Sequence, residues 1–207
     1  QNRSTGAEHY VQITVTSQLG ANIKLTYGPD ETSIGDFILA PNVPQTIPIN
    51  YSALEPSLSE NIENKGIHLV SDNPVNVYAL NYRTQSSDVA VIYPVKSIGS
   101  EYYAMCYSPK STNSETKSEF LIAATASNTT VKIVPSVDCE TNKANSTITV
   151  TLNKGQVYQV RSMSDLTGSY ISANQPIAFF SGTMSSYIPN TAASADHLYE
   201  QIPQTTT

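Results

Sequence analysis

The sequence repeats itself after about half its length, and this repeat limits the folds that it can adopt. Residues 71–78 (SDNPVNVY) match residues 172–179 (SANQPIAF), and Pro74 and Pro176 are 102 positions apart. Residues 66–69 (GIHL) match residues 168–171 (GSYI) at the same spacing. A fixed internal spacing indicates repeated structural units.

Two further matches lie earlier in each copy, at slightly different spacings. Residues 10–13 parallel residues 120–123 at a spacing of 110, and residues 23–25 parallel residues 131–133 at a spacing of 108. Small insertions in loops explain the differences. A unit of roughly 100 residues is long enough to enclose its own hydrophobic core.

We therefore expect two tandem similar units, residues 1–97 and residues 98–207. The expected fold is all-β, and each unit is expected to be an antiparallel β-sandwich-like domain. Apolar and polar residues alternate from His9 to Thr16, which is the period of a strand with one buried face. Short segments of this kind, separated by Asn, Gly and Pro, are typical of sandwiches and barrels.

The pattern also places individual elements. The expected strands are residues 9–16, 22–27, 46–51, 66–70, 75–82, 89–93, 101–107, 119–126, 130–134, 147–152, 157–162, 169–172, 177–181 and 197–202. Pro48 favours an edge strand, because proline cannot donate to a ladder. Residues 53–63 are expected to form a loop with one helical turn, and residues 153–155 (NKG) a hairpin turn.

The end of the second copy matches the end of the first. Residues 200–207 occupy the place that residues 91–97 occupy before the second copy begins. We therefore expect that the native protein continues into a further unit after Thr207.

Composition excludes several classes of function. Charged residues make up 14% of the 207 residues, and the net charge is −6. Without a basic stripe the chain is not expected to bind nucleic acid or an anionic membrane surface. No apolar run is long enough to span a bilayer. The many Ser and Thr residues and the few charges favour a secreted or cell-surface protein.

The two cysteines, Cys106 and Cys139, both lie in the second copy. One interpretation is two free, buried thiols. The other is a disulfide, which we expect because the composition is typical of extracellular proteins. Such a bond would close the longer loops of the second copy and stabilise it by roughly 3–4 kcal/mol.

Four Asn residues stand in the pattern Asn-X-Ser/Thr that accepts N-linked glycans. They are Asn2, Asn50, Asn128 and Asn145. A chain this rich in Asn, Ser and Thr produces about as many by chance, so the pattern marks candidate sites only. Asn128 and Asn145 are expected to lie in exposed loops on either side of the strand at Val131.

Several short blocks resemble the N-terminal domain of the IgG-Fc-binding protein family. They are residues 87–88, 93–94, 165–169, 174–182 and 196–203, and the resemblance runs from about Tyr10 to Pro203. It implies a secreted or surface-exposed all-β module. Relatives occur in animal mucus proteins beside von Willebrand-type domains and in large bacterial surface proteins. The family name implies Fc binding, but no motif assigns an Fc site to particular residues.

No catalytic, cofactor-binding or metal-binding residues are predicted. His197 lies beside Asp196, but adjacent residues on a strand point to opposite faces, so a structural hydrogen bond is the expected role of His197. Asp165 is expected to close an Asx-type turn with Gly168 rather than to bind calcium.

The 13 tyrosines allow two interpretations. Alternation puts Tyr103 and Tyr107 on one face of a strand and Tyr102 and Cys106 on the other. We expect core packing for one such set, and an exposed set would suit contact with a protein or a carbohydrate.

These observations favour a non-enzymatic, extracellular adhesion or assembly module of a larger mucus-like, matrix or cell-surface protein. The expected partners are a protein, a glycan, or neighbouring domains or copies of the parent chain. The alternative is a specific binding module for immunoglobulin Fc or for glycans. A hydrolase is disfavoured, because no nucleophile–base pair is visible in the sequence.

Overall fold

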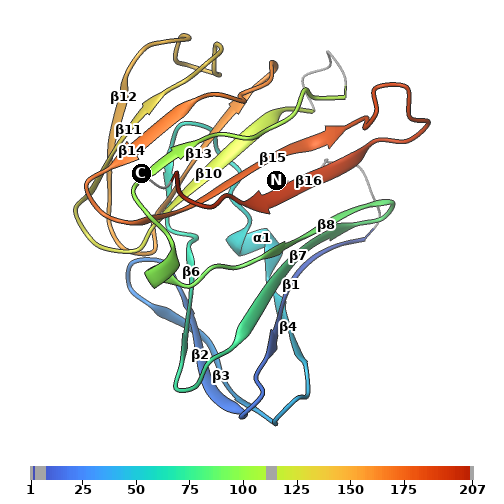
Figure 1. The fold of residues 1–207 in the computed structure, drawn as a ribbon, viewed down its shortest axis with the longest axis vertical. Coiled ribbons are helices and arrows are strands. Elements are labelled where there is room, and N and C mark those ends of the chain that lie inside the picture. The colour runs from blue at the N-terminus through green and yellow to red at the C-terminus, as the bar shows by residue number, and fades with distance from the viewer. Residues whose placement is uncertain (1, 3–7, 111–115, 206–207) are drawn as a thin grey trace.

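The computed structural model describes residues 2, 8–110 and 116–205, and it is all-β (Figure 1). The helical segments in these ranges are α1 (Tyr51–Leu54) and the short 3-10 turn η1 (Val95–Ser97). All strand pairs are antiparallel. The predicted fold class is therefore confirmed.

Strands of the first half form two sheets, here called sheet A and sheet B. The spatial order in sheet A is β4 (Gln45–Ile49), β1 (His9–Thr16), β7 (Asn76–Arg83) and β8 (Ser86–Val91). The order in sheet B is β3 (Thr32–Leu39), β2 (Ala21–Tyr27) and β6 (Ile67–Ser71). Pro48 lies in the edge strand β4, as its missing N–H requires.

Strands of the second half form sheets C and D. The order in sheet C is β16 (Asp196–Gln201), β15 (Ile177–Ser186), β10 (Ser118–Ala124), β13 (Val157–Ser162) and β5 (Ile62–Glu63). The order in sheet D is β12 (Ile148–Leu152), β11 (Thr129–Val134), β14 (Tyr170–Ala173) and β9 (Glu101–Tyr103). One edge strand of sheet C, β5, comes from the first half of the chain.

The two halves share one pattern of strand pairing. When β1, β2, β3, β4, β6, β7 and β8 are matched with β10 to β16 in chain order, every pairing in sheets A and B recurs in sheets C and D. The second half adds β9 to sheet D and takes β5 into sheet C. Because β5 crosses the expected boundary, the division into units 1–97 and 98–207 remains a prediction.

Strand pairing also shows which residues of the two copies correspond. Leu25 lies opposite Leu69, and Ile133 lies opposite Ile171, which agrees with the spacings of 108 and 102. Strand β1 is different. Ile13 lies opposite Ala79 and Phe120 lies opposite Ser181, so at the spacing of 102 for β7 and β15, Ile13 corresponds to Phe120. The spacing of 110 expected for this strand is three residues too large.

Each half has its own hydrophobic core. In the first half, Val15 and Leu25 are fully buried between sheets A and B. In the second half, Phe179 lies between Phe120 and Tyr102, with ring centroids 5.5 and 5.1 Å away. Burial of one such side chain stabilises a fold by roughly 1.5–3 kcal/mol, so sheet-on-sheet packing holds each half together.

Several expectations about elements were wrong, among them the loop at residues 53–63, whose last two residues form the strand β5. Residues 153–155 do not close a hairpin, because β12 pairs with β11 and β13 pairs with β10, in different sheets. Strand β3 was not expected, because its sequence TSIGDFIL does not alternate and its pairing with β2 shifts register between Leu25 and Thr26. Alternation reports a strand only where one face is buried along its whole length.

Three glycines bring the two halves into close backbone contact. The Gly28 N–H donates to the Gly66 carbonyl, and the Gly66 N–H donates to the Gly155 carbonyl, both at 3.0 Å. A Cβ atom on Gly155 would lie 2.4 Å from the Gly28 carbonyl oxygen. A Cβ atom on Gly66 would likewise lie 2.8 Å from the Gly155 carbonyl oxygen, so a larger residue at either of these two positions would push the halves apart.

We predict that Gly155→Ala destabilises the protein more than Gly168→Ala does. Both glycines have positive φ, 76° and 86°, which costs alanine about 1–2 kcal/mol. Gly168 has free space around its Cβ position, whereas Gly155 adds the contact with Gly28, worth roughly 1–3 kcal/mol more. Urea unfolding measures both values, and equal losses would contradict the role of Gly155.

Candidate functional site

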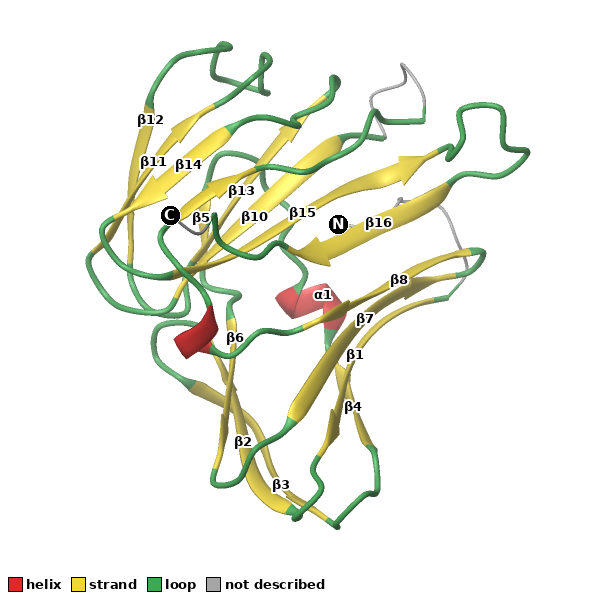
Figure 2. Ribbon diagram, viewed as in Figure 1, coloured by secondary structure: helices red, strands yellow, loops and turns green. Residues whose placement is uncertain are grey.

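The two halves meet where the outer face of sheet C covers the open end of the first sandwich. Figure 2 shows sheets A and B as two arms that separate toward sheet C. Strand β8 runs beside β16 in the same view. Sheet C therefore has a core on one face and the first half on the other.

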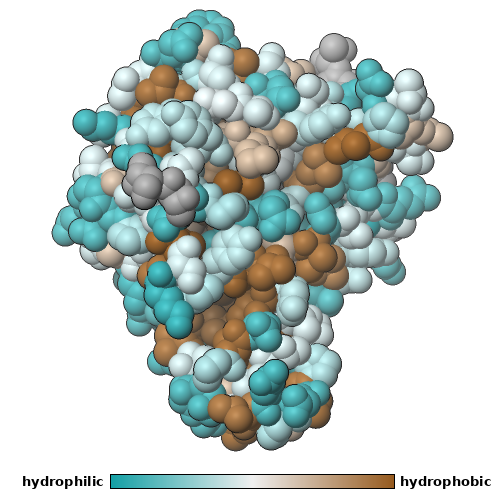
Figure 3. Space-filling view, viewed as in Figure 1, coloured by the Kyte–Doolittle hydropathy of each residue, from teal (hydrophilic) through white to brown (hydrophobic). Residues whose placement is uncertain are grey.

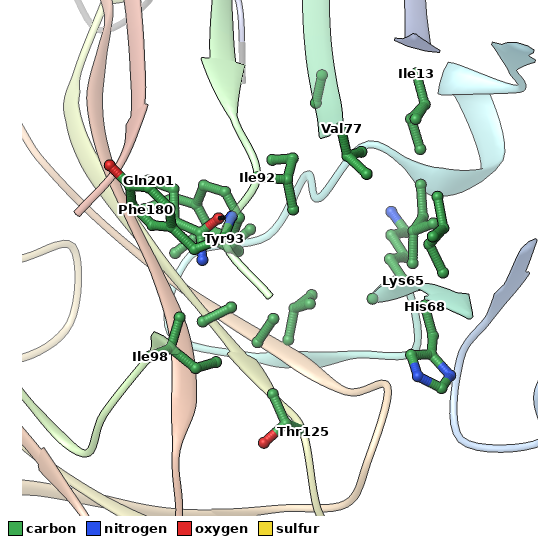
Figure 4. A pocket seen from close by; sticks show the side chains of 18 of the residues that line it. Ile13, Lys65, His68, Val77, Ile92, Tyr93, Ile98, Thr125, Phe180 and Gln201 are labelled. Carbon is green, nitrogen blue, oxygen red and sulfur yellow. Dashed lines mark hydrogen bonds between the residues drawn. The ribbon is translucent and has the colours of Figure 1, made fainter. Parts of the chain in front are cut away.

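A cavity of about 780 Å³ lies at this junction. Its walls come from three sheets. The aliphatic and aromatic side chains that line it include Val11, Ile13, Val77 and Ala79 of sheet A, Leu69 of sheet B, and Leu121, Ala123, Ala178 and Phe180 of sheet C. Figure 3 shows a hollow of apolar residues between the two halves, and Figure 4 shows Ile13 and Val77 across the space from Phe180.

A buried glutamine lies at the side of the cavity where the two halves are connected. The Oε1 atom of Gln201 accepts a hydrogen bond from the Tyr93 N–H at 2.8 Å, and the side chain is fully buried. The Gln201 Nε2 has no hydrogen-bond partner in the described part of the chain. Buried amide donors are normally paired, so this donor is a candidate hydrogen-bond group for a molecule that enters the cavity.

Three lysines line the cavity, and two of them are paired. Lys65 forms an ion pair with Glu63 at 2.6 Å and donates to the Glu55 carbonyl at 2.8 Å. Lys154 pairs with Glu31. Lys96 is exposed on η1 and, among the residues that the structure describes, takes part in no ion pair.

Carboxylates join the neighbouring strands β8 and β16. The Tyr199 N–H donates to Asp88 Oδ2 at 2.9 Å, and the Ser87 N–H donates to Asp196 Oδ1 at 3.0 Å. Ser86 Oγ accepts from the His197 N–H at 3.1 Å. These side chains satisfy backbone donors that two edge strands would otherwise leave open.

His197 is held as a buried, neutral ring. Its Nδ1 lies 3.0 Å from the Thr183 carbonyl oxygen, so the ring donates from Nδ1. Burial lowers the pKa of His197 to about 3. Asp196 is exposed on the other face, so the structure does not bring the two side chains together as a base and its orienting carboxylate.

The turn at Asp165 has the expected Asx geometry. Asp165 Oδ1 accepts hydrogen bonds from the Thr167 N–H at 2.9 Å and the Thr167 hydroxyl at 2.7 Å, and Gly168 has φ of 86°. Among the described residues, no group of three or more His, Cys, Asp or Glu side chains is placed to hold a metal ion. Within the same residues, no helix has the length and apolar character to cross a bilayer.

The tyrosines of residues 101–107 divide between the core and the surface, although the strand β9 ends at Tyr103 and is shorter than the expected strand. Tyr102 is fully buried, and its hydroxyl donates to the Ile177 carbonyl at 2.9 Å. Tyr103 is 54% exposed, and Tyr107 is exposed as well. The alternation was therefore interpreted correctly, and the set that includes Tyr102 is the one that packs inside.

Both cysteines are free thiols in the structure, so the expected disulfide is not formed there. Cys106 Sγ donates to the Glu119 carbonyl at 3.3 Å, and Cys139 Sγ lies 3.7 Å from the Val137 carbonyl. Burial raises the pKa of Cys106 to about 11 and that of Cys139 to about 12. Hydrophobic packing of the second core thus holds the segments that a bridge was expected to join.

The four sequon asparagines lie in different surroundings. Asn2 is fully buried, and its side chain donates to the Ser86 carbonyl at 3.0 Å. Asn50, Asn128 and Asn145 are exposed, and the last two stand at positive φ in turns. Their use as glycan sites stays a prediction.

Comparison with known proteins agrees with this description. The profile of a family described as IgGFc binding protein matches residues 88–207, more than half of the chain. The chain belongs to the IgGFc-binding protein family. The matched region begins at Asp88 and includes β16, so it contains both partners of the Asp88–Tyr199 hydrogen bond.

One relative is the human IgGFc-binding protein, which is 27% identical over 142 residues. The alignment covers 67% of this chain and 3% of the human protein, so the chain spans a small part of that relative's length. No solved structure matches the chain.

We predict that buried His197 makes the fold sensitive to acid. Its folded pKa is about 3 against an ordinary value of 6.5, so between these values only the unfolded chain binds the proton. Stability is then lost as pH falls from about 6.5 toward about 3. His197→Asn keeps a donor for the Thr183 carbonyl and should lose less stability than the wild type between neutral pH and about pH 5.

Urea unfolding at the two pH values gives this difference. His68→Asn is the matched control, because the His68 side chain is 35% exposed and can accept a proton while the protein stays folded. An unchanged acid response in His197→Asn would show that other groups control it.

We predict that both thiols react with iodoacetamide only after unfolding. In the folded chain the raised pKa values keep Cys106 and Cys139 protonated, whereas unfolded cysteine has a pKa near 8.5. Mass spectrometry without reductant should show two modified cysteines in denaturant and slow modification in its absence. No modification in denaturant would instead show a disulfide.

Proposed function

We propose that the chain is an extracellular, non-enzymatic adhesion or assembly module of a larger mucus-like, matrix or cell-surface protein. Membership of the IgGFc-binding protein family supports a binding role. The observation that carries the proposal is an exposed, uncharged sheet face whose counterpart in the second half is covered by another β-unit.

This face is the outer face of sheet A, opposite the first core. It consists of Tyr10, Gln12, Thr14, Thr46, Pro48, Tyr78, Leu80, Tyr82, Ser87, Val89 and Val91, all uncharged. Val89 is 50% exposed and Val91 is 45% exposed. The rings of Tyr10 and Tyr82 stack at 4.4 Å. An uncharged face with exposed valine and tyrosine side chains is typical of an interaction surface.

The repeat indicates what covers this face. Tyr78 on sheet A corresponds to Phe180 on sheet C at the spacing of 102. Phe180 faces the first half of the chain across the junction, whereas Tyr78 faces solvent. A neighbouring β-domain of the same kind, from the parent chain or from a second copy, could therefore cover the outer face of sheet A in the way that the first half covers the outer face of sheet C.

The alternative is a specific binding module for immunoglobulin Fc or for glycans. It is favoured by the name of the human relative, IgGFc-binding protein. Exposed, stacked tyrosines such as Tyr10 and Tyr82 also suit protein and carbohydrate contacts, because they supply area at a low cost in conformational entropy.

The test is surface binding of the chain to three immobilised partners, namely the chain itself, IgG Fc and mucin. We predict saturable binding of the chain to itself. Val89→Asp and Val91→Asp should each weaken the affinity of this self-binding by at least about tenfold, because an unpaired carboxylate is costly to bury in an interface. Both residues are exposed, so folding should change little.

Ile38→Asp is the matched control, because Ile38 is 82% exposed on the outer face of sheet B. Self-binding that resists the sheet A variants would contradict the proposed face. Saturable binding to Fc or mucin without self-binding would contradict the assembly role and support the alternative, a specific binding module for immunoglobulin Fc or for glycans.

A further inference from the structure

The cavity at the junction is too large to be a packing defect. Protein interiors are packed so closely that voids larger than a water molecule are few. The cavity measures about 780 Å³, which lies inside the range of about 300–1,000 Å³ found for small-molecule sites. The two halves are nevertheless held firmly by the glycine contacts and the carboxylate bridges.

The walls suit an aliphatic chain. Val11, Ile13 and Val77 of sheet A face Leu121 and Phe180 of sheet C across the space. A narrow apolar space between two sheets accepts an extended chain of methylene groups, and each methylene that leaves water contributes about 0.8 kcal/mol.

One end of the cavity has the polar groups that an anionic head group needs. Gln201 lines this end with an unpaired Nε2. Its Oε1 is held by the Tyr93 N–H, and Lys96, three residues after Tyr93 in the chain, also lines the cavity. The other two lysines of the wall are already paired.

From these observations we infer that the cavity binds a single-chain amphiphile. The aliphatic chain lies between sheets A and C, and the anionic head, a carboxylate or a phosphate, lies beside Lys96 and Gln201. This site is separate from the outer face of sheet A, because Ile13 and Val77 point to the inner face of that sheet.

Binding is tested with three probes of equal chain length, namely palmitate, palmitoyl lysophosphatidic acid and hexadecanol, by displacement of a fluorescent fatty acid. Both anionic probes should displace it saturably, and hexadecanol should bind more weakly by about tenfold. Displacement by palmitate alone would assign the head as a carboxylate, and displacement by the lysophospholipid alone would assign it as a phosphate. Equal binding of all three would overturn the role of Lys96.

Two kinds of variant locate the site. Ala123→Phe and Ala178→Phe fill the cavity from the sheet C wall and should reduce binding of every probe by at least about tenfold, whereas Ala40→Phe on an exposed turn should not. Lys96→Glu should weaken only the anionic probes, and Lys132→Glu, exposed on β11, is its control. Circular dichroism checks that each variant is folded.

Several results would overturn the inference. The first is that none of the probes binds. The second is that binding persists in both cavity-filling variants although they are folded. The third is that these variants lose domain docking and keep amphiphile binding. The last outcome would show that the cavity receives a protein segment. Val91→Asp separates this inference from the proposed function, because it should abolish docking and leave palmitate binding unchanged.

Discussion

The packing of the first half against the outer face of sheet C is the interaction on which the rest of the structure depends. Sheet B has three strands and sheet A has four, and Val11 and Asn81 of sheet A line the cavity that sheet C closes. In return, the first half shields Leu121 and Phe180 from solvent. Each half therefore supplies a surface that the other lacks, and the polar bonds of β8 and β16 fix their relative position.

The segments that resemble the family in the sequence turn out to hold this packing together. Asp88, Tyr93, Tyr199 and Gln201 all take part in hydrogen bonds between the two halves. Asp196 and His197, which were not expected to form a catalytic pair, also serve the junction: Asp196 accepts from the Ser87 N–H, and the His197 N–H donates to Ser86 Oγ. The blocks of family resemblance in this chain thus meet a structural requirement, namely that edge strands from two halves need acceptors for their N–H groups.

The sequence predicted the parts of the fold that depend on neighbouring residues. Alternation located β1, β2, β7 and β10, and proline placed β4 at an edge. Prediction from the sequence failed where tertiary contacts decide the local structure. Strand β3 has a shifted register, and at residues 153–155 the chain passes from one sheet to another. The cavity could not be predicted, because Val11, Leu69 and Phe180 share a wall only after the halves have docked.

Strand β5 has a consequence for the integrity of the molecule. The segment before and within it is attached along β13, with Glu60 N–H donating to the Gln159 carbonyl at 2.7 Å and Ile62 opposite Tyr158. The covalent connection between the halves runs elsewhere, through η1. A protease that cut the chain at η1 would therefore leave both fragments associated, because the strand pairing of β5 with β13 and the bonds between β8 and β16 do not depend on that peptide bond.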